Sequence, residues 1–500
     1  SRAGVSYPLP AIIEEHLPII IFVSVGLGRS TLPLAADCFL PRSLLAAIDR
    51  DPAAMARPIA FLRHSKNVYS LSQALIRRGQ LRRNRGELES SERDYLTALD
   101  LIGRQAERAA DVAIRSQLFA TATESYDAII TLAADRGDLD RCFRYSEQAR
   151  AFLFRSADPS VPASSDWACV ADEAKRRNDL VIEYAVLPNR LLVWCFAGGR
   201  MTLHEQPLGE DELKEFVRAA ETLRRPALER LSGVLLKSID LSVRRNLIFI
   251  PDKELRSVSF AALIDPETHS YVLRKATVRV VPSATWYCSH PQRLTVKPVT
   301  LLALGDPAFN RQLFSSLSPL RQAGFEAMQI ASLYARPTVL TASSATPGQF
   351  LRLAGKADVI HFAGHAFTDS RDPLLSALVL SAQGPDASGL LYAKDILRMR
   401  LRRSPSIVLS ACATAGGAAY GRGISNVAFA FLAAGAHTVV AATAPVSDED
   451  TFLLLLDYHR RIAAGQSPEW ALRDAQLSML DRSDSDREDI SRWGLFEVIG

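Results

Sequence analysis

The sequence lacks the cysteine patterns that would indicate a disulfide scaffold or a zinc site. Its six cysteines are scattered, with no C-x-x-C pair and no Cys/His cluster of zinc-finger spacing. They are Cys38, Cys142, Cys169, Cys195, Cys288 and Cys412. Isolated thiols of this kind are typical of a reducing compartment, so we expect free thiols and a cytoplasmic protein.

Long apolar runs are also missing. The run from Leu17 to Val25 has nine residues and contains Pro18, whereas a membrane-spanning helix needs about 20. No basic leader with a small-residue cleavage site is present, so we expect neither a membrane span nor a signal peptide. A chain that begins at Ser1 is compatible with a fragment or a processed product.

The charge balance excludes little. A formal charge of +4 over 500 residues does not indicate a nucleic-acid partner. With 48% hydrophobic and 23% charged residues the chain is globular, and its length predicts about three domains. We interpret two arginine-rich runs as solvated helix faces or loops rather than polyanion sites: Arg77, Arg78, Arg82, Arg83 and Arg85, then Arg398, Arg400, Arg402 and Arg403.

Motifs for several common enzyme classes are missing. The sequence contains no G-x-S-x-G elbow of serine hydrolases and no phosphate-binding P-loop. Gly26 and Gly28 form half of a dinucleotide fingerprint, but Thr31 occupies the place of the third glycine. Residues 1–55 therefore remain a segment of uncertain structure, which we interpret as a buried strand or helix.

Residues 56–156 are predicted to be helical, because apolar residues recur there every three or four positions. One long amphipathic helix is expected over 110–134 and a return helix over 139–154, with a turn at Gly137. Such a pair resembles a tetratricopeptide (TPR) unit and typically packs on a neighbouring domain or binds a partner protein. Residues 156–166 have the composition of a linker.

The pattern then changes to alternating strands and helices. Residues 167–288 are predicted to form a first α/β part, and residues 299–500 a regular alternation of six strands with helices. This alternation predicts a mostly parallel six-stranded sheet covered by helices. A histidine follows the third of these strands and a cysteine follows the fourth, which is the caspase-type order.

That histidine and cysteine are the candidate catalytic residues. The segment ADVIHFAGHA contains His365, and SIVLSACATAGG contains Cys412. The spacing of 47 residues is close to the roughly 50 expected for a caspase-type pair. A thiol attacks as thiolate and needs a base, which His365 would supply before protonating the leaving amine. The alternative, a buried core cysteine, fits poorly with a strand that ends in a glycine-rich turn.

Backbone amides would complete the site. The tetrahedral intermediate of acyl transfer needs N–H donors, and we expect the amide of Cys412 together with that of Gly364 or Ala366. His361 and His365 have the spacing of a helical metal pair, but they lie in a strand with no third ligand nearby. We therefore expect no metal, and we interpret His361 as a core histidine that is hydrogen-bonded beneath the site.

These segments resemble the CHAT domain, a caspase-like peptidase domain often joined to TPR repeats. The resemblance rests on HFAGHA, IVLSACATAGG, GRGISNVAFAFLAAGAHTVVAATAPVSDEDT and GLFEVIG, and it covers about 167–500. It implies kinship with caspases, separase and gingipains, with a His365/Cys412 dyad and no metal or cofactor. The chain departs from the family where Ala366 replaces a usual glycine, and where a loop that commonly contains tryptophan reads TAPVSDED.

The resemblance also implies a specificity pocket. In separase-like relatives an acidic residue after the strand next to the cysteine binds a basic P1 side chain. Asp448 is the best match here, with Asp450 as a second candidate. These acids could equally cap a helix over 450–464 at its positive end.

Two functions are compatible with these features. The first is a cysteine endopeptidase that cleaves a protein substrate and is regulated through its helical N-terminal part. By analogy with the family, this would serve bacterial defence or regulated cell death. The second is a catalytically inactive caspase-like scaffold that binds partners through its helices. Neither requires nucleic acid or a membrane span.

Overall fold

The computed structural model describes most of the chain after residue 50. The described ranges are 51–109, 112–157, 164–241, 246–290, 297–318, 320–369, 373–382, 388–411, 427–444, 446–482 and 489–500. Contacts divide the chain into two compact units, Ser1–Cys142 and Phe143–Gly500. The predictions for residues 1–50, including the Gly26/Gly28 motif, fall outside the described residues, as does Cys412.

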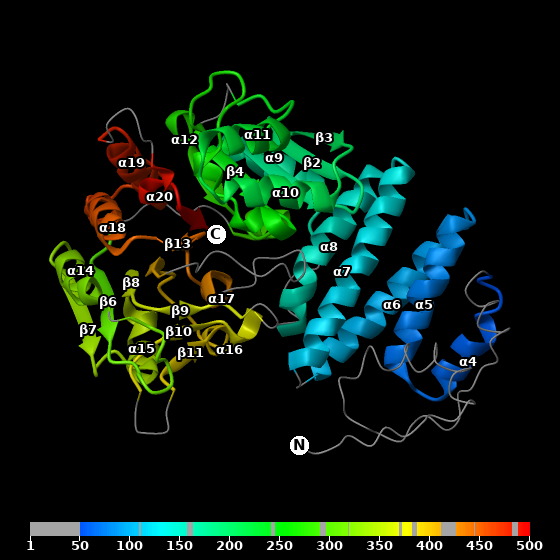
Figure 1. The fold of residues 1–500 in the computed structure, drawn as a ribbon, viewed down its shortest axis with the longest axis horizontal. Helices are drawn as coiled ribbons and strands as arrows, with labels where there is room; N and C mark the ends of the chain where they lie inside the picture. Colours follow the sequence, from blue (N-terminus) through cyan, green and yellow to red (C-terminus); the bar gives the residue numbers. More distant parts are fainter. Residues whose placement is uncertain are drawn as a thin grey trace, which may run out of the picture. The chain divides into compact units, whose positions relative to one another are not determined.

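The first unit is built from helices (Figure 1). They are α4 (Ala56–His64), α5 (Val68–Asn84), α6 (Leu88–Arg108), α7 (Val112–Asp135) and the start of α8 (Leu139–Ala157). The longer helices bury apolar residues at the expected spacing, as Leu71 and Leu75 do in α5 and Tyr95, Ala98 and Ile102 do in α6. The predicted helical region is therefore confirmed, whereas its assignment to the TPR family stays a prediction.

Two turns of this unit have the same geometry. Gly86 and Gly137 both adopt positive φ, 77° and 66°. After α7, the Gly137 amide donates to Ala134 O at 3.0 Å and the Asp138 amide donates to Ala133 O at 3.0 Å. The same two bonds close α5 around Gly86. This is the Schellman arrangement, in which glycine allows the left-handed residue that ends the helix.

Ion pairs neutralise much of the first arginine-rich run. Asp94 accepts from Arg78 at 2.6 Å and from Arg82 at 2.7 Å, and its side chain is only 5% exposed. Arg85 pairs with Asp51 at 3.0 Å. These arginines hold helices together, which argues against a polyanion site here.

The second unit contains one long sheet. Its strands are β1 (Asp179–Val186), β2 (Leu191–Ala197), β3 (Arg200–Gln206), β4 (Asn246–Ile250), β5 (Thr277–Val280), β6 (Thr300–Pro307), β7 (Arg336–Ala342), β8 (Val359–Ala363), β12 (Ser406–Ser410), β13 (Thr438–Ala442) and β14 (Phe496–Ile499). Their order is β3-β2-β1-β4-β5-β14-β13-β12-β8-β6-β7. A smaller sheet has the order β11-β10-β9, formed by β9 (Ala366–Phe367), β10 (Ala377–Val379) and β11 (Leu390–Tyr392).

The helices of the second unit alternate with these strands. They are α9 (Trp167–Arg177), α10 (Glu210–Ala220), α11 (Arg225–Leu235), α12 (Val272–Lys275), α13 (Ala284–Ser289), α14 (Arg321–Ala331), α15 (Pro347–Leu353), α16 (Ala393–Ile396), α17 (Val427–Ala433), α18 (Asp448–Ala463), α19 (Pro468–Leu480) and α20 (Ile490–Trp493). Short 3₁₀ turns occur at η1 (Lys253–Ser257), η2 (Phe260–Ala262), η3 (Ala354–Lys356) and η4 (Pro373–Leu375).

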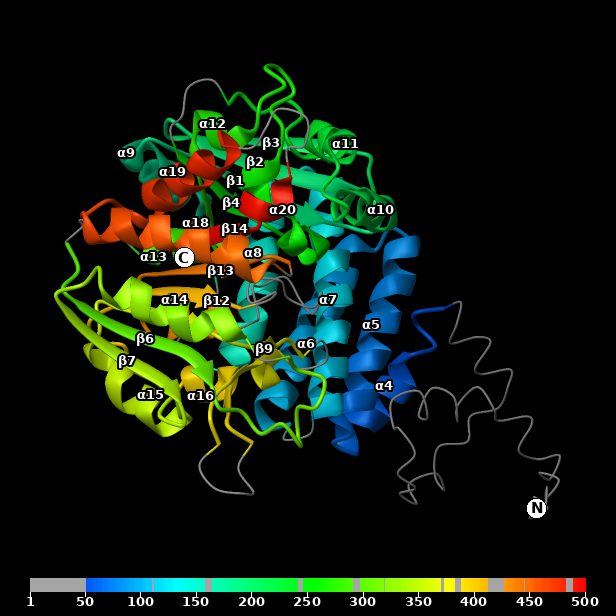
Figure 2. The ribbon, with the colours of Figure 1, turned by 60° about the vertical axis from the view of Figure 1, so that its left-hand side comes forward.

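The part after residue 299 has the caspase-like arrangement expected from the sequence. Its six strands are neighbours in the order β7-β6-β8-β12-β13-β14, and they are parallel except for β14 against β13. Helices α14, α18 and α19 cover one face, where Ile330, Leu455 and Ala471 join the core with Val359 and Val408 (Figure 2). The opposite face includes the contact between Phe350 of α15 and Phe431 of α17, with ring centroids 5.9 Å apart. Alternate strand residues thus meet helices on both faces.

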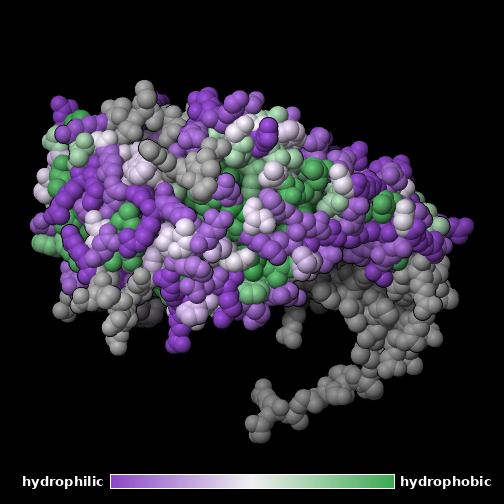
Figure 3. Space-filling model, turned by 90° about the horizontal axis from the view of Figure 1, so that it is seen from above, coloured by the Kyte–Doolittle hydropathy of each residue, from purple (hydrophilic) through white to green (hydrophobic). Residues whose placement is uncertain are grey.

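Surface polarity is mixed. On the face drawn in Figure 3, hydrophilic residues predominate and hydrophobic residues show in separate small groups. Among the described helices, none is both long and apolar enough to cross a bilayer.

Buried charges anchor the second half of α8 in the second unit. The Arg150 side chain is fully buried and donates to Pro251 O at 2.7 Å and to Glu183 Oε1 at 3.2 Å. Glu147, also fully buried, accepts from the amide of Thr285 at 2.6 Å. Burial, followed by the nearby Glu147 carboxylate, raises the pKa of Glu183 well above its ordinary value. These bonds tie α8 to β1 and α13.

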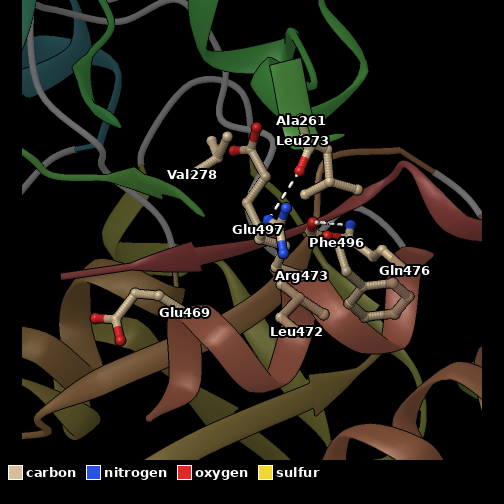
Figure 4. Close-up of a pocket in the computed structure, with 9 residues that line it drawn as sticks. All are labelled: Ala261, Leu273, Val278, Glu469, Leu472, Arg473, Gln476, Phe496 and Glu497. Carbon is tan, nitrogen blue, oxygen red and sulfur yellow. Dashed lines mark hydrogen bonds between the residues drawn. The ribbon is translucent and has the colours of Figure 1, made fainter. Parts of the chain in front are cut away.

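A seam joins the first five strands to the last six. Strand β14 pairs in parallel with β5 and antiparallel with β13. One sheet therefore includes strands from both sides of the boundary predicted at residues 288–299. Arg473 of α19 crosses this seam by donating to Leu273 O at 2.9 Å, and Gln476 of the same helix donates to Phe496 O of β14 at 3.0 Å (Figure 4). The small pocket among these residues has no space that would admit a water molecule. The seam is therefore a packed core, and the predicted domain boundary in this region stays a prediction.

Glu497 lies in this seam and accepts from the amide of Phe260 at 2.8 Å. Burial raises the pKa of Glu497 from 4.5 to about 8. The native state then holds a proton that the unfolded chain releases near pH 4.5. Stability should therefore fall as the pH rises from about 4.5 to about 8.

We expect Glu497→Gln to remove this loss, because the amide stays neutral at every pH. Between pH 5 and pH 8, the substitution should reduce the pH dependence of the unfolding free energy by roughly 1.4 kcal/mol per pH unit. Urea unfolding at several pH values measures it, with the exposed Glu212→Gln as a matched control. An unchanged slope in Glu497→Gln would contradict the assignment.

Candidate functional site

His365 follows the carboxyl end of β8, a strand that is buried along its whole length. A glycine suits the preceding position, because a Cβ on Gly364 would lie 2.6 Å from the ring of Phe362 and would force that ring to move. The Gly364 amide donates to Ser410 O of the neighbouring strand β12 at 3.2 Å. The chain around His365 is thus fixed by the main sheet on one side.

The smaller sheet holds the other side. The carbonyl of His365 accepts from the amide of Val379 at 2.9 Å, and Ala366 pairs with Leu378 of β10. His365 therefore sits where the chain passes from one sheet to the other. This double attachment restricts the backbone of His365, whose side chain is half-buried.

The imidazole has a defined orientation. Nε2 of His365 lies 2.8 Å from Ser318 O, and a carbonyl can only accept. Nε2 must then carry the proton, which leaves Nδ1 as an acceptor. The ring of Phe309 meets the imidazole edge-on, with centroids 5.5 Å apart and an interplanar angle of 86°. Sequence patterns did not indicate Ser318 or Phe309, because both lie in an irregular segment after β6.

Two further phenylalanines continue this aromatic group. Phe314 lies 6.5 Å from Phe309 and 5.5 Å from Phe367, measured between ring centroids. The segment after β6 is thereby packed against Phe367 of β9. This packing positions the Ser318 carbonyl against His365.

Cys412 lies outside the described residues, so the dyad stays a prediction. The structure describes the strand before it: β12 pairs in parallel with β8, and Ser410 is the partner of Ala363. In the sequence, Cys412 follows Ser410 by two residues, as His365 follows Ala363. The two neighbouring strands thus end at the same level.

The predicted oxyanion donors are also only partly described. The amide of Gly364 is engaged by Ser410 O, which leaves Ala366 as the better candidate next to His365. The amide of Cys412 falls outside the described part of the chain.

His361 heads a buried polar chain beneath His365. His459 Nε2 of α18 lies 3.2 Å from His361 Nδ1, and Tyr334 Oη lies 2.8 Å from His459 Nδ1. His361 Nε2 is 3.1 Å from Glu326 Oε1, although these two atoms make no well-oriented hydrogen bond. Both histidines are fully buried. The structure agrees with a hydrogen-bonded core histidine at this position.

The acidic residues 448–450 occupy the first turn of α18, which Ser447 caps. Asp450 pairs with Arg492 at 2.9 Å, so its charge is already neutralised. Asp448 and Glu449 are exposed. A helix-capping role is thus visible for this turn, and the proposed P1 pocket at Asp448 and Asp450 stays a prediction.

Among the described residues, no group of three or more His, Cys, Asp or Glu side chains could hold a metal ion.

Comparisons with known proteins agree with this fold. A family model described as the CHAT domain matches residues 218–500, more than half of the chain. The separase–securin complex of Saccharomyces cerevisiae is similar in structure, with a TM-score of 0.52 and 10% identity over 90% of this chain and 44% of that chain. A second structure of that complex gives a TM-score of 0.51 with the same identity and coverage. The cysteine proteinase gingipain R matches with a TM-score of 0.37 and 10% identity, over 58% of this chain and 74% of that chain.

The chain thus spans less than half the length of the separase chain that it matches. No curated protein matches the chain in sequence. At an identity of 10%, the match to the separase–securin structures shows a shared fold and no more. That fold is a helical region followed by a mostly parallel, caspase-like sheet.

Burial, followed by the neighbouring His361, lowers the pKa of His459 well below 6.5. Folding therefore opposes protonation of His459, and stability should fall as the pH drops below about 6.5. We expect His459→Gln to be less stable at pH 8 but to lose less stability between pH 7 and pH 5.

The pH dependence of the unfolding free energy should differ between His459→Gln and the parent protein by roughly 1.4 kcal/mol per pH unit at most. Urea unfolding at each pH measures it, and His204→Gln on the edge strand β3 is the control. Equal acid sensitivity in His459→Gln and the parent protein would refute this account.

Proposed function

The chain belongs to the CHAT domain family, and we propose that it is a cysteine endopeptidase in which Cys412 is the nucleophile and His365 the base. The observation that supports this most directly is the register of β8 and β12. Ala363 and Ser410 are partners, and each candidate catalytic residue lies two positions further along. Parallel strands that end at one level direct their following residues to the same edge of the sheet.

The orientation of His365 suits this role. Because Nε2 donates to Ser318 O, Nδ1 is free to take the proton of a thiol. The carbonyl also stabilises the imidazolium that forms and keeps the ring from rotating. Ser318 is therefore a positioning group in this proposal, acting through its backbone oxygen.

The reaction follows from these groups. The Cys412 thiolate attacks the peptide carbonyl, and the amides of Cys412 and Ala366 bind the developing oxyanion. Collapse of the intermediate forms a thioester while His365 protonates the leaving amine. A water molecule, deprotonated by His365, then hydrolyses the thioester and restores the thiol. No metal or cofactor takes part in these steps.

The helices before residue 157 are the proposed regulatory part, through which a partner protein would act. Their TPR-like pairing and their place before the peptidase support this role. A reducing compartment such as the cytoplasm would keep Cys412 reduced. A role in bacterial defence or regulated cell death rests on family analogy alone.

Replacing either member of the dyad should abolish cleavage without unfolding the protein. We expect Cys412→Ala and His365→Ala each to lower kcat/KM by roughly 10³-fold or more. A positional-scanning peptide library identifies a cleaved sequence, on which the variants are then compared. Cys169→Ala and His204→Ala are matched controls outside the site.

Thermal unfolding checks the fold of each variant. Full cleavage by Cys412→Ala would disprove the assignment. Absence of any cleavage by the parent chain across protein and peptide substrates would favour an inactive scaffold.

The same library tests substrate choice. We infer that Asp448 binds a basic P1 side chain, so Asp448→Ala should reduce the preference for Arg or Lys by about tenfold or more. Glu449→Ala is the matched control, because it removes the same charge from the same helical turn. Equal effects of the two variants would indicate helix capping rather than a pocket.

A further inference from the structure

Two cysteines that lie far apart in the sequence meet between α9 and α13. Two hydrogen-bonded contacts fasten α13 to α9 and to the residues just before α9. The amide of Ser165 donates to Thr285 Oγ1 at 2.8 Å. Arg177, the last residue of α9, donates to the carbonyls of Tyr287 and His290 at 3.2 Å each. Its guanidinium also lies over the Tyr287 ring, 4.4 Å from the centroid.

The cysteines lie between these two contacts. Cys169 is four residues beyond Ser165, and Cys288 is three residues beyond Thr285. Each is thus about one helical turn further along from the first contact, on the side that faces the other helix. The two thiols are close enough to influence each other electrostatically. Cys169 is exposed and Cys288 is half-buried.

We propose that Cys169 and Cys288 are a thiol oxidation site that forms a reversible disulfide with hydrogen peroxide. Both thiols are free, and the contacts on either side hold this part of the chain together. The site is separate from Cys412 and does not depend on peptidase activity.

The exposed thiol reacts first. The Cys169 thiolate attacks one peroxide oxygen, giving a sulfenic acid and releasing hydroxide. The Cys288 sulfur then displaces the hydroxyl of this sulfenic acid, so that an S–S bond forms and water leaves with the Cys288 proton. In total, two thiols and one hydrogen peroxide give one disulfide and two waters.

The surroundings fit this order of events. Burial, followed by the neighbouring Cys169 thiol, raises the pKa of Cys288, so Cys288 remains a thiol until its partner is oxidised. Glu147 and Glu173 also disfavour a thiolate at Cys288. A shielded thiol next to an exposed one would resolve the sulfenic acid before peroxide oxidises it further.

The disulfide would close a loop that includes strands β1 to β5. A long loop loses much of its unfolded-state freedom when it is cross-linked. Oxidation should therefore raise the Tm of the second unit by a few °C, and a thiol reductant should reverse the shift.

The full chain is treated with hydrogen peroxide, the remaining thiols are blocked, and non-reduced peptides are mapped by mass spectrometry. We expect a Cys169–Cys288 peptide pair lighter by two hydrogen atoms, which disappears after reduction. Cys169→Ser and Cys288→Ser should each abolish both the pair and the Tm shift. Cys195→Ser, which replaces a buried cysteine elsewhere in the sheet, should keep them.

Three outcomes would overturn the proposal. They are Cys169 oxidised to sulfinic acid without cross-linking, a disulfide that joins Cys169 to another cysteine, and no reaction at either residue. The proposed peptidase function is tested separately, because the Cys412→Ala protein should form the same disulfide.

Discussion

The parallel pairing of β8 with β12 is the constraint on which the candidate site depends. Its register places Ala363 opposite Ser410, so the chain leaves both strands at the same edge of the sheet. Shifting this register by one residue would reverse the faces of the buried side chains, and the core therefore opposes it. The short side chains and the glycine after β8 let the backbone turn at once into β9.

Buried polar contacts make the packing of helices on the sheet specific. His361 is bonded to His459 of α18, and Arg150 binds carbonyls and a carboxylate at the other end of the sheet. Such groups add little net stability, because removing them from water is costly. Their geometry is demanding, however, and an alternative packing would leave them unpaired. They favour one arrangement of helices on the sheet over its competitors.

The long sheet also connects regions with different proposed roles. Strand β14 is bonded both to β13, next to the strand before Cys412, and to β5, which leads to α13. The second half of α8 reaches the same area through Glu147 and Thr285. The second half of α8, helix α13 and the strands β8 and β12 thus belong to one continuous hydrogen-bonded framework within the second unit.

Local patterns in the sequence determined the helical region, the alternation of strands and helices after residue 299, and the candidate His365 and Cys412. Periodicity and strand-end turns are properties of neighbouring residues, so they can be read without coordinates. The contacts of Ser318 with His365, of Asp450 with Arg492, and of Arg177 with Tyr287 join residues from separate segments. So does the pairing of β14 with β5. Only the tertiary structure decided these, because no local pattern specifies which distant segments come together.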